Sequence, residues 1–91
     1  MSQRTWTLAV HAGAERVLAR LPHKIAAAVV EFMLGPLCDD PTRVGKPLRK
    51  ELAGLYVARR GSYRIVYELD KEHRTVMVLR IDHRADIYRP R

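Results

Sequence analysis

The pattern of hydrophobic and polar positions divides the first part of the chain into one alternating stretch and two helical ones. Residues 5–10 alternate roughly and are β-prone, which predicts a first strand. Residues 14–21 carry apolar side chains at i, i+3, i+4 and i+7, the spacing of one helix face, and residues 25–34 repeat that spacing. Pro22 disfavours helix in the residue before it and suits the first turn of a new helix, so we expect a helical hairpin.

A polar segment separates this hairpin from the rest of the chain. Gly35 and Pro36 predict the end of the second helix. Asp39-Asp40-Pro41 then predicts a loop, which carries the basic stretch from Lys46 to Lys50.

The segment from Leu55 to Tyr67 predicts a β-hairpin. Two runs of β-branched and aromatic residues flank Arg60-Gly61-Ser62, and Gly61 can adopt the positive φ of a tight turn. Alternation places Tyr63, Ile65 and Tyr67 on one face of the second strand, and Arg64, Val66 and Glu68 on the other. Tyr63 and Tyr67 are interpreted as core residues, so Arg64 is expected to point away from the helix-covered core.

Residues 74–81 predict a last strand beside this hairpin. We expect Met77, Leu79 and Ile81 on one face, and Val76, Val78 and Arg80 on the other, with Val78 and Arg80 beside Arg64. A strand that is apolar on both faces is typical of a central position. The order β-α-α-β-β-β predicts an α+β sandwich, a helical hairpin on a four-stranded, mainly antiparallel sheet, with residues 1–91 as one domain.

Charge is distributed unevenly along the chain. The formal net charge is +7, and the first 42 residues contribute nothing to it, because four basic side chains balance four acidic ones. Residues 43–91 carry thirteen Lys or Arg against six Asp or Glu. A basic surplus confined to the predicted sheet is typical of a nucleic-acid-binding surface, although an acidic protein partner would also fit it.

Most catalytic and cofactor signatures are missing from the sequence. The four histidines stand far apart, so we expect no metal site, and the absence of a glycine-rich phosphate loop predicts no nucleotide cofactor. Cys38 is the single cysteine, and no apolar run could serve as a signal peptide or span a membrane. These features predict a cytoplasmic protein without membrane contact.

Basic residues with aromatics among them are the remaining candidates for chemistry. RNA can be cut without metal when its 2′-hydroxyl attacks the adjacent phosphorus and cations stabilise the transition state. The candidate cations and aromatics are Lys46, Arg49, Lys50, Tyr56, Arg59, Arg60, Tyr63, Arg64, Arg80, His83, Arg84 and Tyr88. Among them, His83, Tyr88 and Lys46 are the candidates for proton transfer.

Three motifs together resemble the RelE toxins of bacterial toxin-antitoxin modules. They are Lys46-Pro-Leu-Arg49, the hairpin Gly61-Ser-Tyr63-Arg64-Ile-Val-Tyr67, and His83-Arg84-Ala-Asp-Ile-Tyr88. The resemblance implies a small α+β toxin, a ribosome-dependent mRNA endoribonuclease that inhibits translation and needs no cofactor. It also implies a cognate RelB-like antitoxin, with the ribosome and mRNA as partners and DNA contacted only through the antitoxin complex.

The resemblance also implies roles for individual residues. Arg64 would clamp the transition state and Arg84 would be a second phosphate clamp. Tyr88 would stack on or orient the nucleotide, and His83 would be the acid. The remaining contacts to RNA would come from Lys46, Arg49 and Arg59, with Lys50, Arg60 and Arg80 as further basic candidates.

One departure from the family pattern leaves alternatives open. Many relatives carry a basic residue where this chain has Val57, so Arg60 or Lys50 would have to compensate, and the general base is not identified. The alternatives are a ParE-like toxin that poisons DNA gyrase without cutting RNA, and a degenerate toxin that retains only antitoxin binding.

Overall fold

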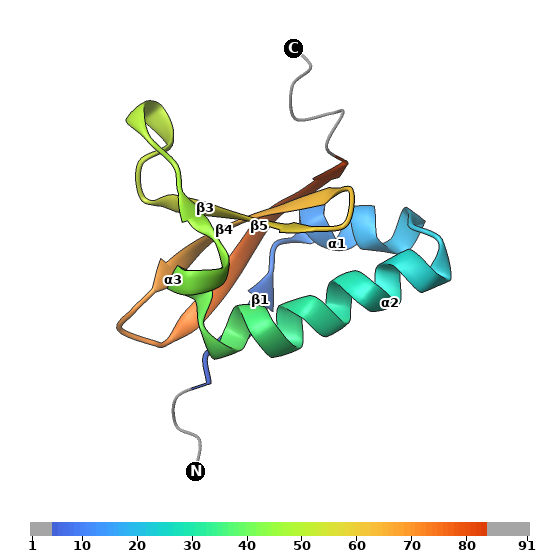
Figure 1. The fold of residues 1–91 in the computed structure, drawn as a ribbon, viewed down its shortest axis with the longest axis horizontal. Coiled ribbons are helices and arrows are strands. Elements are labelled where there is room, and N and C mark those ends of the chain that lie inside the picture. Colours follow the sequence, from blue (N-terminus) through green and yellow to red (C-terminus); the bar gives the residue numbers. More distant parts are fainter. Residues whose placement is uncertain (1–4, 84–91) are drawn as a thin grey trace.

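The computed structural model, which describes residues 5–83, is an α+β sandwich (Figure 1). The predicted fold class is confirmed. Its elements are β1 (Thr7–Val10), α1 (Ala12–Arg20), α2 (His23–Phe32), the π-helix η1 (Met33–Leu37), α3 (Pro41–Val44), β2 (Lys46–Pro47), the 3₁₀-helix η2 (Lys50–Leu52), β3 (Leu55–Arg60), β4 (Tyr63–Asp70) and β5 (Thr75–His83).

The sheet has five strands in the order β1-β5-β4-β3-β2. Among the strands of residues 5–83 only β1 pairs in parallel, with β5, so the mainly antiparallel character is confirmed, as is the central position of the last strand. The predicted number of strands was one too low. The additional strand, β2, is only Lys46 and Pro47 paired with β3, and two residues are too few for alternation to be visible in a sequence.

The predicted hairpin is confirmed in its position and its faces. Gly61 and Ser62 connect β3 to β4, and Gly61 has φ +63°, as the first central residue of a tight hairpin turn requires. Ile65 and Tyr67 are completely buried under the helices. Arg64 alternates with them and therefore points to the opposite face.

The predicted faces of β5 are wrong at its C-terminal half because of a β-bulge. Val66 pairs with Arg80 but Tyr67 pairs with Val78, so Leu79 is an extra residue in β5. The bulge inverts the alternation, and Ile81 joins the buried Val78 in the core. Leu79 and Arg80 both line the opposite face instead, so Val78 does not lie beside Arg64.

The helical hairpin packs on one face of the sheet (Figure 1). The break at Leu21 and Pro22 is confirmed, but the predicted helix end at Gly35-Pro36 is wrong. The chain continues from α2 through η1, with Pro36 inside the π-helical turn. A wider turn accommodates the missing proline N–H, and it keeps Met33 and Leu37 buried in the core.

Within residues 5–83, no helix combines the length and the apolar character that crossing a membrane requires. The side of the sheet away from α1 and α2 carries the segment around η2, which is yellow-green in Figure 1 and projects beyond the sheet.

Candidate nucleic-acid interface

Arg64 lies near the start of β4, the middle strand of the sheet, on the face that the helices leave uncovered. Across the strands it pairs with Arg59 of β3 on one side and with Asp82 of β5 on the other. Directly paired residues share a face, so these three side chains form a row. Two arginines placed opposite each other repel, and a row of this kind favours an anion between them.

Two predicted catalytic cations and one predicted RNA-binding cation meet in one pocket of about 410 Å³. Lys46, Arg59 and Arg64 lie in its wall together with Val44, Val57 and Ala58. We call it the cationic pocket. Lys46 reaches it because β2 pairs Lys46 with Val57 of β3.

A second pocket of about 430 Å³ adjoins the first through Arg64. We call it the apolar pocket, because its wall is mostly aliphatic. The lining residues are Leu48, Leu52, Leu55, Val57, Val66 and Leu79, with Arg64, Arg80 and Asp82 as the polar members. The Nη2 atom of Arg80 lies 2.8 Å from the Oδ2 atom of Asp82, and this ion pair lies on the polar side of the pocket.

Tyr67 positions the segment that carries Lys46. Its hydroxyl is buried and donates a hydrogen bond of 2.6 Å to the carbonyl oxygen of Pro41 in α3. The Tyr56 ring stacks on the Tyr67 ring at a centroid distance of 5.5 Å. Burial is the main cause that raises the pKa of the Tyr67 hydroxyl, and Tyr56 contributes further, so this hydroxyl stays a donor.

The other described candidates lie away from the cationic pocket. Arg60 points to the helix side of β3, where it lines two further pockets beside α2. Arg49 and Lys50 are exposed at η2. The His83 ring meets the Tyr63 ring edge-on at 5.2 Å, and its pairing with Tyr63 places it on the face opposite Arg64.

Two further candidates, Arg84 and Tyr88, lie outside the described residues, so their predicted roles stay predictions. Asp82 and the aliphatic wall of the apolar pocket were missed by sequence reasoning. The signal for Asp82 was present, because it is a carboxylate in an otherwise apolar and basic strand.

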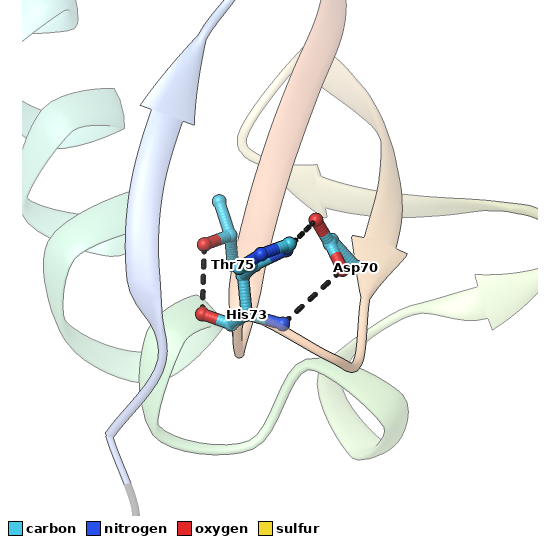
Figure 2. A network of polar contacts seen from close by, with 3 residues as sticks. All are labelled: Asp70, His73 and Thr75. Atoms are coloured by element: carbon cyan, nitrogen blue, oxygen red, sulfur yellow. Dashed lines mark hydrogen bonds and ion pairs between the residues drawn. The ribbon is translucent and has the colours of Figure 1, made fainter.

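Three side chains that offer metal-ligand atoms lie at the turn between β4 and β5. Ligand atoms of Asp70, Glu72 and His73 lie within 4.8 Å of one another, and all three residues are exposed. Asp70 accepts a hydrogen bond of 3.2 Å from the His73 backbone N–H, and its other carboxylate oxygen lies 2.8 Å from Nδ1 of His73. Figure 2 shows both contacts. The Thr75 hydroxyl donates to the carbonyl oxygen of His73, so these contacts close the turn.

Comparison with known proteins identifies the family. Residues 8–88 match the family described as ParE toxin of type II toxin-antitoxin system, parDE. The chain belongs to the RelE/ParE family of type II toxins. This RelE/ParE chain is 63% identical over 76 residues to Toxin RelG of Mycobacterium tuberculosis, across 84% of the chain and 87% of the relative. It is 54% identical over 82 residues to Toxin RelE of the same organism, which covers 90% of this chain and 84% of that relative.

Solved structures agree with this RelE/ParE assignment. The toxin-antitoxin complex RelBE2 from M. tuberculosis superposes with a TM-score of 0.84 at 55% identity, across 88% of this chain and 99% of the other. The isolated RelE toxin of E. coli superposes with a TM-score of 0.70 at 16% identity, across 86% of this chain and 83% of the other. It therefore has the same fold. The resemblance predicted from the three motifs is therefore confirmed.

Proposed function

We propose that this toxin is an endoribonuclease that cuts mRNA on the ribosome. The observation that carries the proposal is the meeting of Lys46, Arg59 and Arg64 in one pocket on the uncovered sheet face. Three cations at one place suit a phosphodiester, whose negative charge increases when a fifth oxygen attacks the phosphorus. The names RelE and RelG of the relatives support the same assignment.

The proposed reaction is a transesterification within the RNA. The 2′-hydroxyl oxygen forms a bond to the adjacent phosphorus, the bond from phosphorus to the 5′-oxygen breaks, and the products are a 2′,3′-cyclic phosphate and a 5′-hydroxyl. One proton leaves the 2′-hydroxyl and one reaches the 5′-oxygen. Arg64 and Arg59 stabilise the charge on the non-bridging oxygens, and Lys46 is the described residue of the cationic pocket that can exchange a proton.

The ribosome would orient the RNA for the reaction, which the cationic pocket alone cannot do. Arginines hold charge but do not orient a flexible RNA for in-line attack, and correct positioning lowers such barriers by up to roughly 7–11 kcal/mol. We therefore expect free RNA to be cut slowly. His83 lies on the far face from Arg64, so its role as the acid would require contact with RNA beyond the cationic pocket.

We also propose a RelB-like antitoxin as the partner that neutralises the toxin. The relative with 55% identity was crystallised as a RelBE2 toxin-antitoxin complex, and relatives from Pyrococcus horikoshii and Methanococcus jannaschii as RelE-RelB complexes. The net charge of +7 favours an acidic partner.

The test compares wild type with Arg64→Ala in a cell-free translation reaction and maps the mRNA ends by primer extension. Arg16→Ala is the matched control, because Arg16 is an exposed arginine of α1 outside the cationic pocket. We expect cuts within translated codons for wild type and the control, and a loss of about 10²-fold or more for Arg64→Ala. Intact mRNA together with trapped gyrase-DNA complexes would establish the ParE-like alternative instead.

A further inference from the structure

Four neighbouring pockets share arginine side chains in their walls. Arg64 lies in the walls of the apolar and the cationic pockets, and Arg59 joins the cationic pocket to a third. Arg60 in turn joins the third pocket to a fourth. The third has about 430 Å³ and lies against Phe32 and Pro36, and the fourth has about 310 Å³ and lies between Lys24 of α2 and the β3–β4 turn. We call this series the arginine trench.

The trench passes around the edge of the sheet because of how β3 ends. Arg59 and Arg60 are consecutive strand residues, so one points to the uncovered face and the other to the helix side. The short strand β2 pairs only with Tyr56 and Val57. On the side of β3 away from β4, no strand in the described part of the chain pairs with the segment from Ala58 to Arg60, so the trench can cross this edge.

The charges along the trench favour a polyanion. Its cations are Lys46, Arg64, Arg59, Arg60, Lys24 and Arg80. Its two carboxylates are those of Asp82, which pairs with Arg80 in the apolar pocket, and of Glu31 in the third pocket. Arg59, Arg60 and Lys24 are exposed, so they can reach a ligand without rearrangement. Spaced guanidinium groups match the repeated phosphates of a single nucleic-acid strand better than the single charge of a small ligand.

We propose that the arginine trench holds RNA beyond the scissile phosphate, from the cationic pocket around the edge of β3 to α2. The inference rests on the proposed nuclease function. Arg60 and Lys24 then bind phosphates remote from the bond that is cut. Remote contacts of this kind hold the reacting part of a substrate in place.

The test measures the binding of a fluorescently labelled, 2′-O-methylated RNA, which cannot be cut because its attacking hydroxyl is blocked. The full chain is compared with the double variant Lys24→Ala/Arg60→Ala by fluorescence anisotropy over a range of salt concentrations. The matched control is Arg16→Ala/Arg20→Ala, which removes the same charge from exposed positions of α1. Thermal melting establishes that all variants are folded.

We expect the trench variant to bind a strand of about twelve nucleotides more weakly than wild type and the control do. The slope of log K against log salt should decrease by about 1.4, because each phosphate contact with a single strand contributes about 0.7. A strand of about three nucleotides, too short to pass the β3 edge from the cationic pocket, should bind all the variants alike.

Equal effects of the two double variants would overturn the proposal, because they would show only the general attraction of a basic protein. Weakened binding of an acidic antitoxin with unchanged binding of RNA would also overturn it, and would assign the trench to that partner. Failure of the nuclease proposal is seen separately, as intact mRNA in the translation reaction, because the blocked RNA reports binding without cleavage.

Discussion

Gly45 and Tyr67 are in such close contact that no larger residue fits at position 45. A Cβ atom on Gly45 would overlap the Tyr67 hydroxyl and would come within 3.0 Å of the carbonyl oxygen of Val57. The next residue along the chain is Lys46, so the absence of a side chain at Gly45 lets the segment pack against β3 and brings Lys46 into the cationic pocket.

Gly45→Ala should therefore destabilise the protein. Overpacking of a buried site costs about 1–3 kcal/mol, and the loss would appear as a lower midpoint of urea unfolding. Gly35→Ala is the matched control, since no atom lies within 4 Å of a Cβ built at that position. Equal midpoints for the two variants would show that the close approach of Gly45 to Tyr67 has no energetic consequence.

Tyr67→Phe should lower both the stability and the activity. It removes the donor to Pro41 and leaves a buried carbonyl oxygen without this partner, a loss of about 1–3 kcal/mol in unfolding free energy. If Tyr67 acts by positioning Lys46, its effect on RNA cleavage should be much smaller in a Lys46→Ala background. Additive effects in this double-mutant cycle would contradict the positioning role.

Arg59→Gln should stabilise the free protein while it weakens RNA cleavage. It removes the repulsion between directly opposed arginines, which is of the order of 0.2–1 kcal/mol, and it also removes a cation from the cationic pocket. Chemical denaturation and primer extension measure the two effects. Arg60→Gln is the control for stability, because Arg60 lies opposite Tyr63 rather than opposite an arginine, and its unfolding free energy should stay at the wild-type value.

The Asp70 turn should contribute a small, pH-dependent part of the stability. The side-chain hydrogen bond with His73 is the main cause that lowers the pKa of Asp70. Between the lowered folded pKa and the ordinary unfolded value, the unfolded chain binds more protons, so stability rises with pH there. The contribution is fully present above the unfolded pKa and is lost as the pH falls through the folded one.

Asp70→Asn should remove this pH-dependent contribution. The difference in unfolding free energy between wild type and the variant should be largest near neutral pH and should shrink in acid, as measured by denaturation at several pH values. Asp39→Asn, a change at another exposed aspartate, serves as the comparison. A difference in unfolding free energy that grew in acid would contradict a lowered pKa of Asp70 in the folded protein.

Local periodicity explains why much of the fold could be predicted. The helical hairpin, the turn at Gly61 and the faces of Arg64 and Tyr67 all depend on neighbours within a few positions. The bulge at Leu79, in contrast, depends on how β5 pairs with β4, and the helix passes Pro36 because Leu37 finds a place in the core. Neither cause is visible in the residues around those positions.

The sequence alone determined the order of the elements, the excess of positive charge in the second half and the three motifs of a RelE-type toxin. Only the tertiary structure decided which cations meet. It brought Lys46 beside Arg59 and Arg64 through a two-residue strand and the hydrogen bond from Tyr67 to Pro41, and it turned Arg60 and His83 to the other side of the sheet. The reason is physical: alternation sets the face of a side chain within one strand, but strand pairing and core packing set the neighbours of that face.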